Sequence, residues 1–154
     1  MTNREIIENY NRLAELQQKE ENYRILNGKQ MFEGRIKVTY AIKKNMAELL
    51  NKIKPYQESL QELQKEYRNL EEERKVYEEK KKAFEETAKD GMKAEPERKE
   101  IFREGKSKEE YETKLKELME IDVEDVSIHT VPVDCLDGLQ LSSTDLTAFM
   151  FMLE

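Results

Sequence analysis

The fold of this chain is decided by residues 42–84, IKKNMAELLNKIKPYQESLQELQKEYRNLEEERKVYEEKKKAF. Apolar residues recur here at alternating steps of four and three, the heptad spacing of a helix that lays one narrow stripe against another helix. We call this stripe the seam; it consists of Ile42, Met46, Leu49, Ile53, Tyr56, Leu60, Leu63, Tyr67 and Leu70. The sequence leaves open whether this chain, a second copy or another protein covers the seam.

The composition favours long helices over a thick globular core. Of the 154 residues, 40% are charged and 37% are hydrophobic, with three prolines and five glycines. The single cysteine, Cys135, excludes an intrachain disulfide and fits a reducing cytosol. No stretch has the roughly 20 apolar residues of a membrane span, and the first residues, MTNREIIENY, lack the apolar stretch of a signal peptide. We therefore expect a cytoplasmic protein that does not enter a membrane.

The chain divides into three predicted regions. Residues 1–91 form a helical hairpin, in which a first helix, with Asn3 as its N-cap, runs to about residue 21 and packs on a long helix. The long helix runs from about residue 37 to residue 89, about 75 Å at the usual rise, with a kink near Pro55. Residues 92–106 form a mobile connector, and residues 107–154 form a small cap.

The cap is predicted to contain helices and strands. Ser107 and Glu110 form a capping box that opens a third helix, and the alternating residues 121–133 indicate a strand. A turn at Asp137-Gly138 leads to a second short strand, Leu139-Gln140-Leu141, and Ser142 or Ser143 caps a last helix with Leu146, Phe149, Met150 and Leu153 on its buried face. The predicted fold is therefore mainly α, with a long kinked helix, a coiled-coil-like seam and a C-terminal α/β cap.

No catalytic, cofactor or metal motif is evident. The single histidine, His129, lies near Asp134, Cys135 and Asp137, but a structural zinc site needs four Cys or His ligands and the chain has two such residues. We interpret His129 as a solvated strand residue and Cys135 as a small buried thiol. No glycine-rich phosphate loop is present, so we predict neither an enzyme nor a small-molecule site.

Charge is unevenly distributed along the chain, whose net charge is −7. Residues 29–54 carry seven basic and two acidic side chains, whereas the acidic excess lies mainly beyond residue 55. The candidate contacts to an anion or nucleic acid are Lys37, Lys43, Lys44, Lys52 and Lys54, with Tyr40 near enough to stack on a base. The glutamates of residues 71–79 lie at helical spacing from lysines, as in Glu71–Lys75 and Glu78–Lys82, and indicate a solvated helix face.

The order of these segments resembles a family of small uncharacterised proteins encoded by tailed phages and prophages of Gram-positive bacteria. The resemblance rests on KVTYAIKKN at 37–45, VSIHTVP at 126–132 and LSSTDLTAFM at 141–150. It implies a phage or prophage origin, a binding role and action in the bacterial cytoplasm.

Three functions remain in competition. The first is a non-enzymatic phage accessory protein that uses the seam for protein–protein interaction and self-associates. This prediction depends on length, because a first helix of about 20 residues cannot cover one of about 50. The second is an inhibitor of a host defence system that binds an effector through its acidic surface. The third is a nucleic-acid-binding accessory that uses the lysines of residues 35–54.

Overall fold

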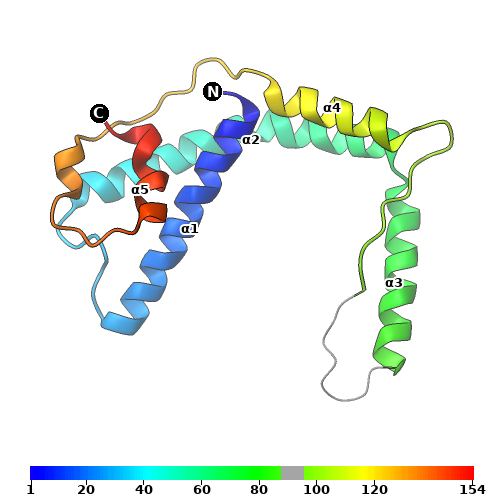
Figure 1. Cartoon of the computed structure of the whole chain (residues 1–154), viewed down its shortest axis with the longest axis horizontal. Helices are drawn as coiled ribbons and strands as arrows, with labels where there is room; N and C mark the ends of the chain where they lie inside the picture. The colour runs from blue at the N-terminus through cyan, green and yellow to red at the C-terminus, as the bar shows by residue number, and fades with distance from the viewer. Residues whose placement is uncertain (88–95) are drawn as a thin grey trace. The chain divides into compact units, whose positions relative to one another are not determined.

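The computed structural model describes residues 1–87 and 96–154, and the regular elements of these residues are all helical (Figure 1). The elements in chain order are α1 (Asn3–Asn27), α2 (Ile36–Tyr67), α3 (Leu70–Thr87), α4 (Lys108–Glu120), the short 3-10 helix η1 (Val133–Leu136), α5 (Ser143–Phe149) and the 3-10 turn η2 (Met150–Met152). The mainly α fold class is therefore confirmed. The chain forms two compact units, residues 1–56 with 119–154 and residues 57–118.

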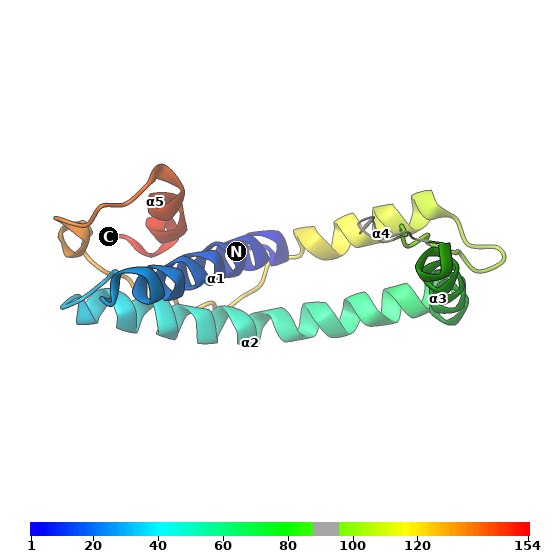
Figure 2. The ribbon, with the colours of Figure 1, turned by 90° about the horizontal axis from the view of Figure 1, so that it is seen from below.

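The first unit is built around a hydrophobic core to which α1, the first half of α2 and the C-terminal segment all contribute (Figures 1 and 2). The helix α5 packs against α1. The core side chains with no more than 2% of their surface exposed include Ile6, Leu13, Phe32, Val38, Ile42, Leu49, Val131, Phe149 and Met152. Phe32 and Phe149 meet edge to face, with ring centroids 5.9 Å apart. A core of this size gives the first unit most of the apolar burial in the described chain.

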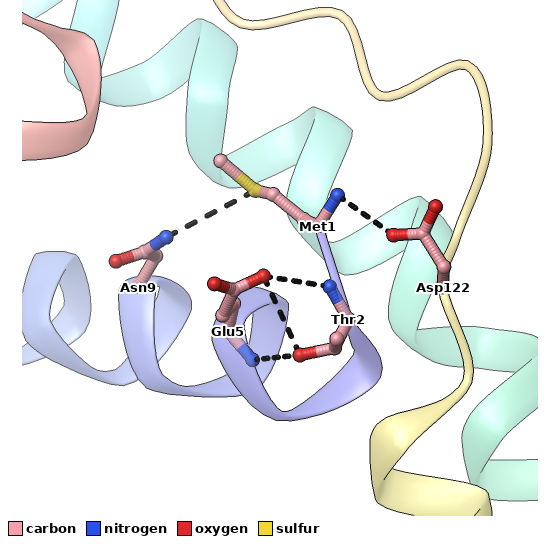
Figure 3. Close-up of polar contacts among 5 residues, drawn as sticks. All are labelled: Met1, Thr2, Glu5, Asn9 and Asp122. Carbon is pink, nitrogen blue, oxygen red and sulfur yellow. Dashed lines mark hydrogen bonds and ion pairs between the residues drawn. The ribbon is translucent and has the colours of Figure 1, made fainter.

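Hydrogen bonds at the N-terminus fix the start of α1 (Figure 3). Thr2, rather than the predicted Asn3, is the N-cap, and its side chain accepts from the Glu5 amide while Glu5 accepts from the Thr2 amide. The terminal ammonium lies 3.2 Å from the carboxylate of Asp122. The helix also runs past residue 21 to the Asn27-Gly28 turn, where Gly28 adopts a positive φ of 67°. Residues 21–30 are all exposed, so this extension of α1 adds little to the core.

The predicted long helix is interrupted at Arg68-Asn69, which corrects the expectation of one helix to residue 89. Two backbone bonds draw this point toward the segment before α4: the Asn69 amide donates to Ile101, and the Arg103 amide donates to Tyr67. The Asn69 side chain then accepts from the Glu72 amide and caps α3. By contrast, α2 remains one continuous helix through Pro55.

The second unit is thin and rich in charge. Tyr67 of α2 packs against Tyr111 of α4, with ring centroids 5.9 Å apart, and Phe102 contacts the same Tyr111 ring at 5.7 Å. In Figure 2, α4 runs beside the last turns of α2. The predicted capping role of Ser107 is present, since its hydroxyl accepts from the Glu110 amide. The predicted connector, residues 92–106, lies partly outside the described residues, and its described end makes the bonds to Tyr67 and Asn69.

The predicted strands of the cap are replaced by an extended segment without a sheet. In the described residues, Val131 makes a single bridge with Leu153, residues 133–136 form η1 after the first expected strand, and residues 139–141, the second expected strand, form no strand. A sheet is not needed, because other groups accept the hydrogen bonds of this segment. Alternate amides of residues 127–131 donate to side chains of α2 and to the end of the chain, so no neighbouring strand has to satisfy them.

The last helix begins as predicted and ends differently. Ser142 is its N-cap in a capping box with Asp145. The chain tightens into η2 at Met150, which turns Met152 into the core and leaves Met150 69% exposed. Leu146 is also exposed, by 44%, and Ala148 takes the buried position beside Phe149. The expected buried positions of Leu146 and Met150 were therefore wrong, because the face turned to the core carries Asp145, Ala148, Phe149 and Met152 instead.

Candidate binding surface

The seam points inward along much of α2. Ile42, Leu49 and Ile53 are buried in the core of the first unit, and Tyr67 is buried in the second unit. The remaining seam residues are half-buried: Met46, Tyr56, Leu60, Leu63 and Leu70. Contacts within one chain thus cover a large part of the stripe, including distal residues that α1 alone was too short to reach. For this reason the seam does not provide the exposed surface on which a binding site can be built.

The opposite face of α2 carries cations and exposed apolar groups. We call it the lysine face; it consists of Ile36, Lys37, Tyr40, Lys43, Lys44, Leu50 and Lys54. Ile36 is 78% exposed, Tyr40 is 54% exposed and Leu50 is 43% exposed. The same span of α2 holds one glutamate, Glu48, which is half-buried and accepts from the Ser127 amide. Between Ile36 and Lys54 the lysine face therefore presents positive charge without an exposed carboxylate, and the first exposed carboxylate of α2, Glu58, follows one turn after Lys54.

The candidate lysines are brought together only in part. Lys37, Lys43, Lys44 and Lys54 are exposed, whereas Lys52 is half-buried and lies toward the inner side of the helix. In the described part of the chain, none of these ammonium groups has a carboxylate oxygen within 4.0 Å. Burial raises the pKa of Glu20, and the nearby charge of Lys43 opposes this shift. Lys43 is thus partly balanced by α1, and Lys37, Lys44 and Lys54 remain the open cations.

A hollow of about 430 Å³ lies at the start of the lysine face. Its lining comes from two segments distant in sequence: Ile36, Lys37, Tyr40, His129, Thr130, Val131 and Pro132. The Tyr40 and His129 rings meet edge to face at 5.2 Å. A hollow of about 510 Å³ beside α1 is larger, but glutamine, glutamate and arginine make up most of its lining. The hollow at Tyr40 combines apolar walls with a cation and is the better match to a protein-binding pocket.

A buried asparagine fixes the C-terminal segment beside this hollow. Asn45 is fully buried on α2, and its side-chain amide donates to the His129 carbonyl at 2.9 Å while its oxygen accepts from the His129 amide at 2.7 Å. The Val131 amide donates to Met152, and the Glu154 amide donates to Val131. Sequence reasoning missed both this anchor and the hollow. The sequence does contain one signal for the anchor: the polar residue Asn45 lies between Ile42 and Leu49 on an otherwise apolar helix face.

The residues considered for a metal site, His129, Asp134, Cys135 and Asp137, form no metal-binding group in the described part of the chain. Among residues 1–87 and 96–154, no three His, Cys, Asp or Glu side chains are placed to hold a metal ion. Asp137 and Cys135 instead offer backbone carbonyls to the guanidinium of Arg35. A search of the helices in the same residues finds none with the length and apolarity needed to cross a membrane.

Compared with models of known families, with curated proteins and with solved structures, the chain matches none. The features of the molecule that bear on its function are therefore the lysine face, the hollow and the extended segment beside it.

Proposed function

We propose that this chain is a non-catalytic binding protein that recognises an acidic partner protein through the lysine face of α2. The observation that carries the proposal is the combination, on one face of residues 36–54, of four exposed lysines, exposed Tyr40 and Leu50, and no exposed carboxylate. Positive charge steers an acidic partner and sets its orientation, while exposed aromatic and aliphatic groups supply the buried anchors of a protein interface.

The apolar groups favour a protein over a nucleic acid. Tyr40 could stack on a base, but Ile36 and Leu50, exposed by 78% and 43%, offer nothing to phosphates and are groups that a protein partner can cover. The net charge of −7 also opposes a nucleic acid away from this face. On the resemblance described above, we propose that the partner is a protein of a phage or of its bacterial host.

The proposal is tested by charge reversal on this face. The variant combines Lys43→Glu, Lys44→Glu and Lys54→Glu, and its matched control combines Lys80→Glu, Lys81→Glu and Lys82→Glu on exposed positions of α3. The immobilised chain is exposed to a nuclease-treated lysate of a Gram-positive host, and each retained protein is then measured against the three chains by calorimetry.

We expect a partner whose affinity falls at least about tenfold with the reversal on α2 and stays unchanged with the reversal on α3. Equal loss in both variants would indicate attraction to net charge alone and would contradict the proposal. Binding of a single-stranded oligonucleotide that weakens steeply with salt and disappears in the α2 variant would assign the lysine face to nucleic acid instead.

A further inference from the structure

We propose that residues 126–132 pair with the same residues of a second copy of this chain, so that two copies form a dimer across a two-fold axis. This inference goes beyond the proposed function and does not depend on it: a second copy would take the Ile36, Lys37 and Tyr40 end of the lysine face, and Lys43, Lys44, Leu50 and Lys54 would remain for a foreign partner. It rests on an open backbone edge, on the register that this edge permits and on the side chains around it.

The extended segment is hydrogen-bonded along one edge only. The amides of Ser127, His129 and Val131 donate to Glu48, Asn45 and Met152. Along an extended chain, alternate residues direct their amide and carbonyl to opposite edges. The groups of Ile128 and Thr130 consequently face the other way, and within the described residues neither backbone has a hydrogen-bond partner. An unpaired edge of this kind is a template for strand addition.

The open groups allow a two-fold antiparallel pair centred on Ile128, His129 or Thr130. We propose the register centred on His129, which places Ile128 of one copy opposite Thr130 of the other and so uses both open residues of each copy. Each such pair exchanges two hydrogen bonds, and the axis passes beside His129. His129 then faces His129 of the second copy in a pair without hydrogen bonds, the kind in which opposing side chains lie closest.

The surroundings of the edge suit a second copy. Ile36, Tyr40 and Val133 lie beside or next to the segment with 78%, 54% and 51% of their surface exposed, and a paired copy would cover them. In the same register, Val126 of the second copy lies opposite Pro132. The preceding exposed acids, Glu124 and Asp125, are thereby brought toward the end of the segment where Lys37 lines the hollow. At each end of the pair, Glu124 and Asp125 of one copy thus approach Lys37 of the other, and the exposed Asp134 lies at the same end.

Position-specific cross-linking tests the register directly. In a Cys135→Ser background, His129→Cys places two thiols across the axis, within the Cβ separation that a disulfide needs. Ser127→Cys is the matched control, because it is equally exposed but its thiols would lie about 13 Å apart along the paired strands. Mild oxidation is expected to convert His129→Cys to a covalent dimer and to leave Ser127→Cys monomeric. Equal cross-linking of both variants would overturn the proposal.

The mass in solution, measured by light scattering over a dilution series, tests the backbone pairing. Thr130→Pro removes the free amide, whereas Thr130→Ala keeps it and loses the same hydroxyl bond to Glu154. We expect dimers of the natural chain and of Thr130→Ala, and a dimer at least about tenfold weaker for Thr130→Pro.

A natural chain that stays monomeric at every concentration would overturn the proposal, even if an acidic peptide or an oligonucleotide then bound at the edge. If Thr130→Pro does not fold, the cross-linking comparison still decides. If the proposed function is wrong and the dimer is right, the charge-reversal variant of α2 still forms the dimer. Failure of one proposal can therefore be told from failure of the other.

Discussion

In the first compact unit, residues 1–56 with 119–154, the largest fully buried side chains are hydrocarbon groups such as Phe32, Phe149 and Leu49. In the described residues of the second unit, 57–118, the buried side chains are Tyr67, Tyr111 and Glu73. The guanidinium of Arg68 forms two hydrogen bonds to the Glu73 carboxylate, at 3.0 and 2.5 Å, and an ammonium group from Lys106 lies 4.9 Å from the Tyr67 ring centroid. One unit is held by apolar burial and the other by rings and paired charges.

This difference arises along a single helix with one regular seam. The heptad pattern states which side of α2 faces inward, but the depth of burial depends on what the rest of the chain places over that side. Over the first half lie α1, the Phe32 loop and the C-terminal segment. Over the last turns lie Tyr111 and Phe102. The same heptad spacing therefore occurs over a thick core in the first half of α2 and over a thin one in its last turns.

The largest effect should come from deleting seam side chains in the first unit. Leu49→Ala removes a side chain with 0% exposure and leaves a cavity, so we expect a loss of about 3 kcal/mol in the free energy of unfolding. Leu60→Ala makes the same chemical change at a half-buried position on the same helix and should cost about 1 kcal/mol. Amide hydrogen exchange measures the opening of each unit separately. Equal losses would show that the two halves of the seam are buried alike.

The next effect concerns the ion pair of the second unit. Glu73 is 2% exposed and Arg68 has a side-chain exposure of 15%, and the hydrogen bonds to Glu73 raise the pKa of Arg68. Glu73→Gln keeps the shape of the side chain but leaves the guanidinium without a counter-charge, so we expect destabilisation by about 2 kcal/mol, confined to residues 57–118. The matched control is Glu72→Gln, an exposed neighbour, which should cost much less. Loss of protection in both units would contradict this local role.

Sequence patterns predicted the parts of the fold that depend on local chemistry. The helix over residues 108–120, the Ser142 cap and the inward side of α2 all follow from capping residues and apolar spacing. The break at Arg68-Asn69 did not follow, because it depends on the bond that the Asn69 amide donates to Ile101 and on the bond that the Arg103 amide donates to Tyr67, each spanning more than 30 residues. The apolar register passes through this break unchanged, so periodicity alone contains no sign of it.

The candidate site also has features that the sequence predicted and features that it did not. The lysines of residues 37–54 were found from sequence, since a local excess of one charge is visible without a structure. The hollow and the open edge were not found, because they arise where residues 129–132 meet α2. Alternation in VSIHTVP indicated extended backbone correctly, but it could not show that Asn45 would hold one edge in place of a neighbouring strand.

A smaller and pH-dependent effect should appear in the first unit. Burial alone would raise the pKa of Asp145, but hydrogen bonds from Lys19, at 2.6 Å, and from Ser142 outweigh it and lower the pKa. A lowered pKa stabilises the fold above the ordinary value of about 3.9, and this contribution is lost as the pH falls through the folded-state pKa. Lys19→Met should cost about 1 kcal/mol near neutral pH, a small value because Lys19 is 49% exposed.

The measurement for Asp145 is urea unfolding between neutral pH and about pH 3. The natural chain should lose stability more steeply than Lys19→Met as the pH falls below about 4, because the variant has less of this contribution to lose. Arg24→Met, which removes an exposed cation paired with Glu21 on the same helix, is the control and should preserve the steeper slope. Parallel curves for the natural chain and Lys19→Met would show that the Asp145 contact does not fasten α5 to α1.

The smallest effect should come from the charges that are most conspicuous in the sequence. Lys75 lies 3.7 Å from Glu71 on α3, but their side chains are 59% and 73% exposed, so water and salt screen the pair. Lys75→Gln should change the stability of the second unit by about 0.3 kcal/mol, and the change should vanish at high salt. Lys82→Gln is its control, because the structure shows no ion pair there within the described residues, although the spacing predicted one with Glu78. A loss at Lys75 comparable to that of Glu73→Gln would mean that charge number, rather than charge burial, holds residues 57–118 together, and the contrast between the two units would then need a different physical basis.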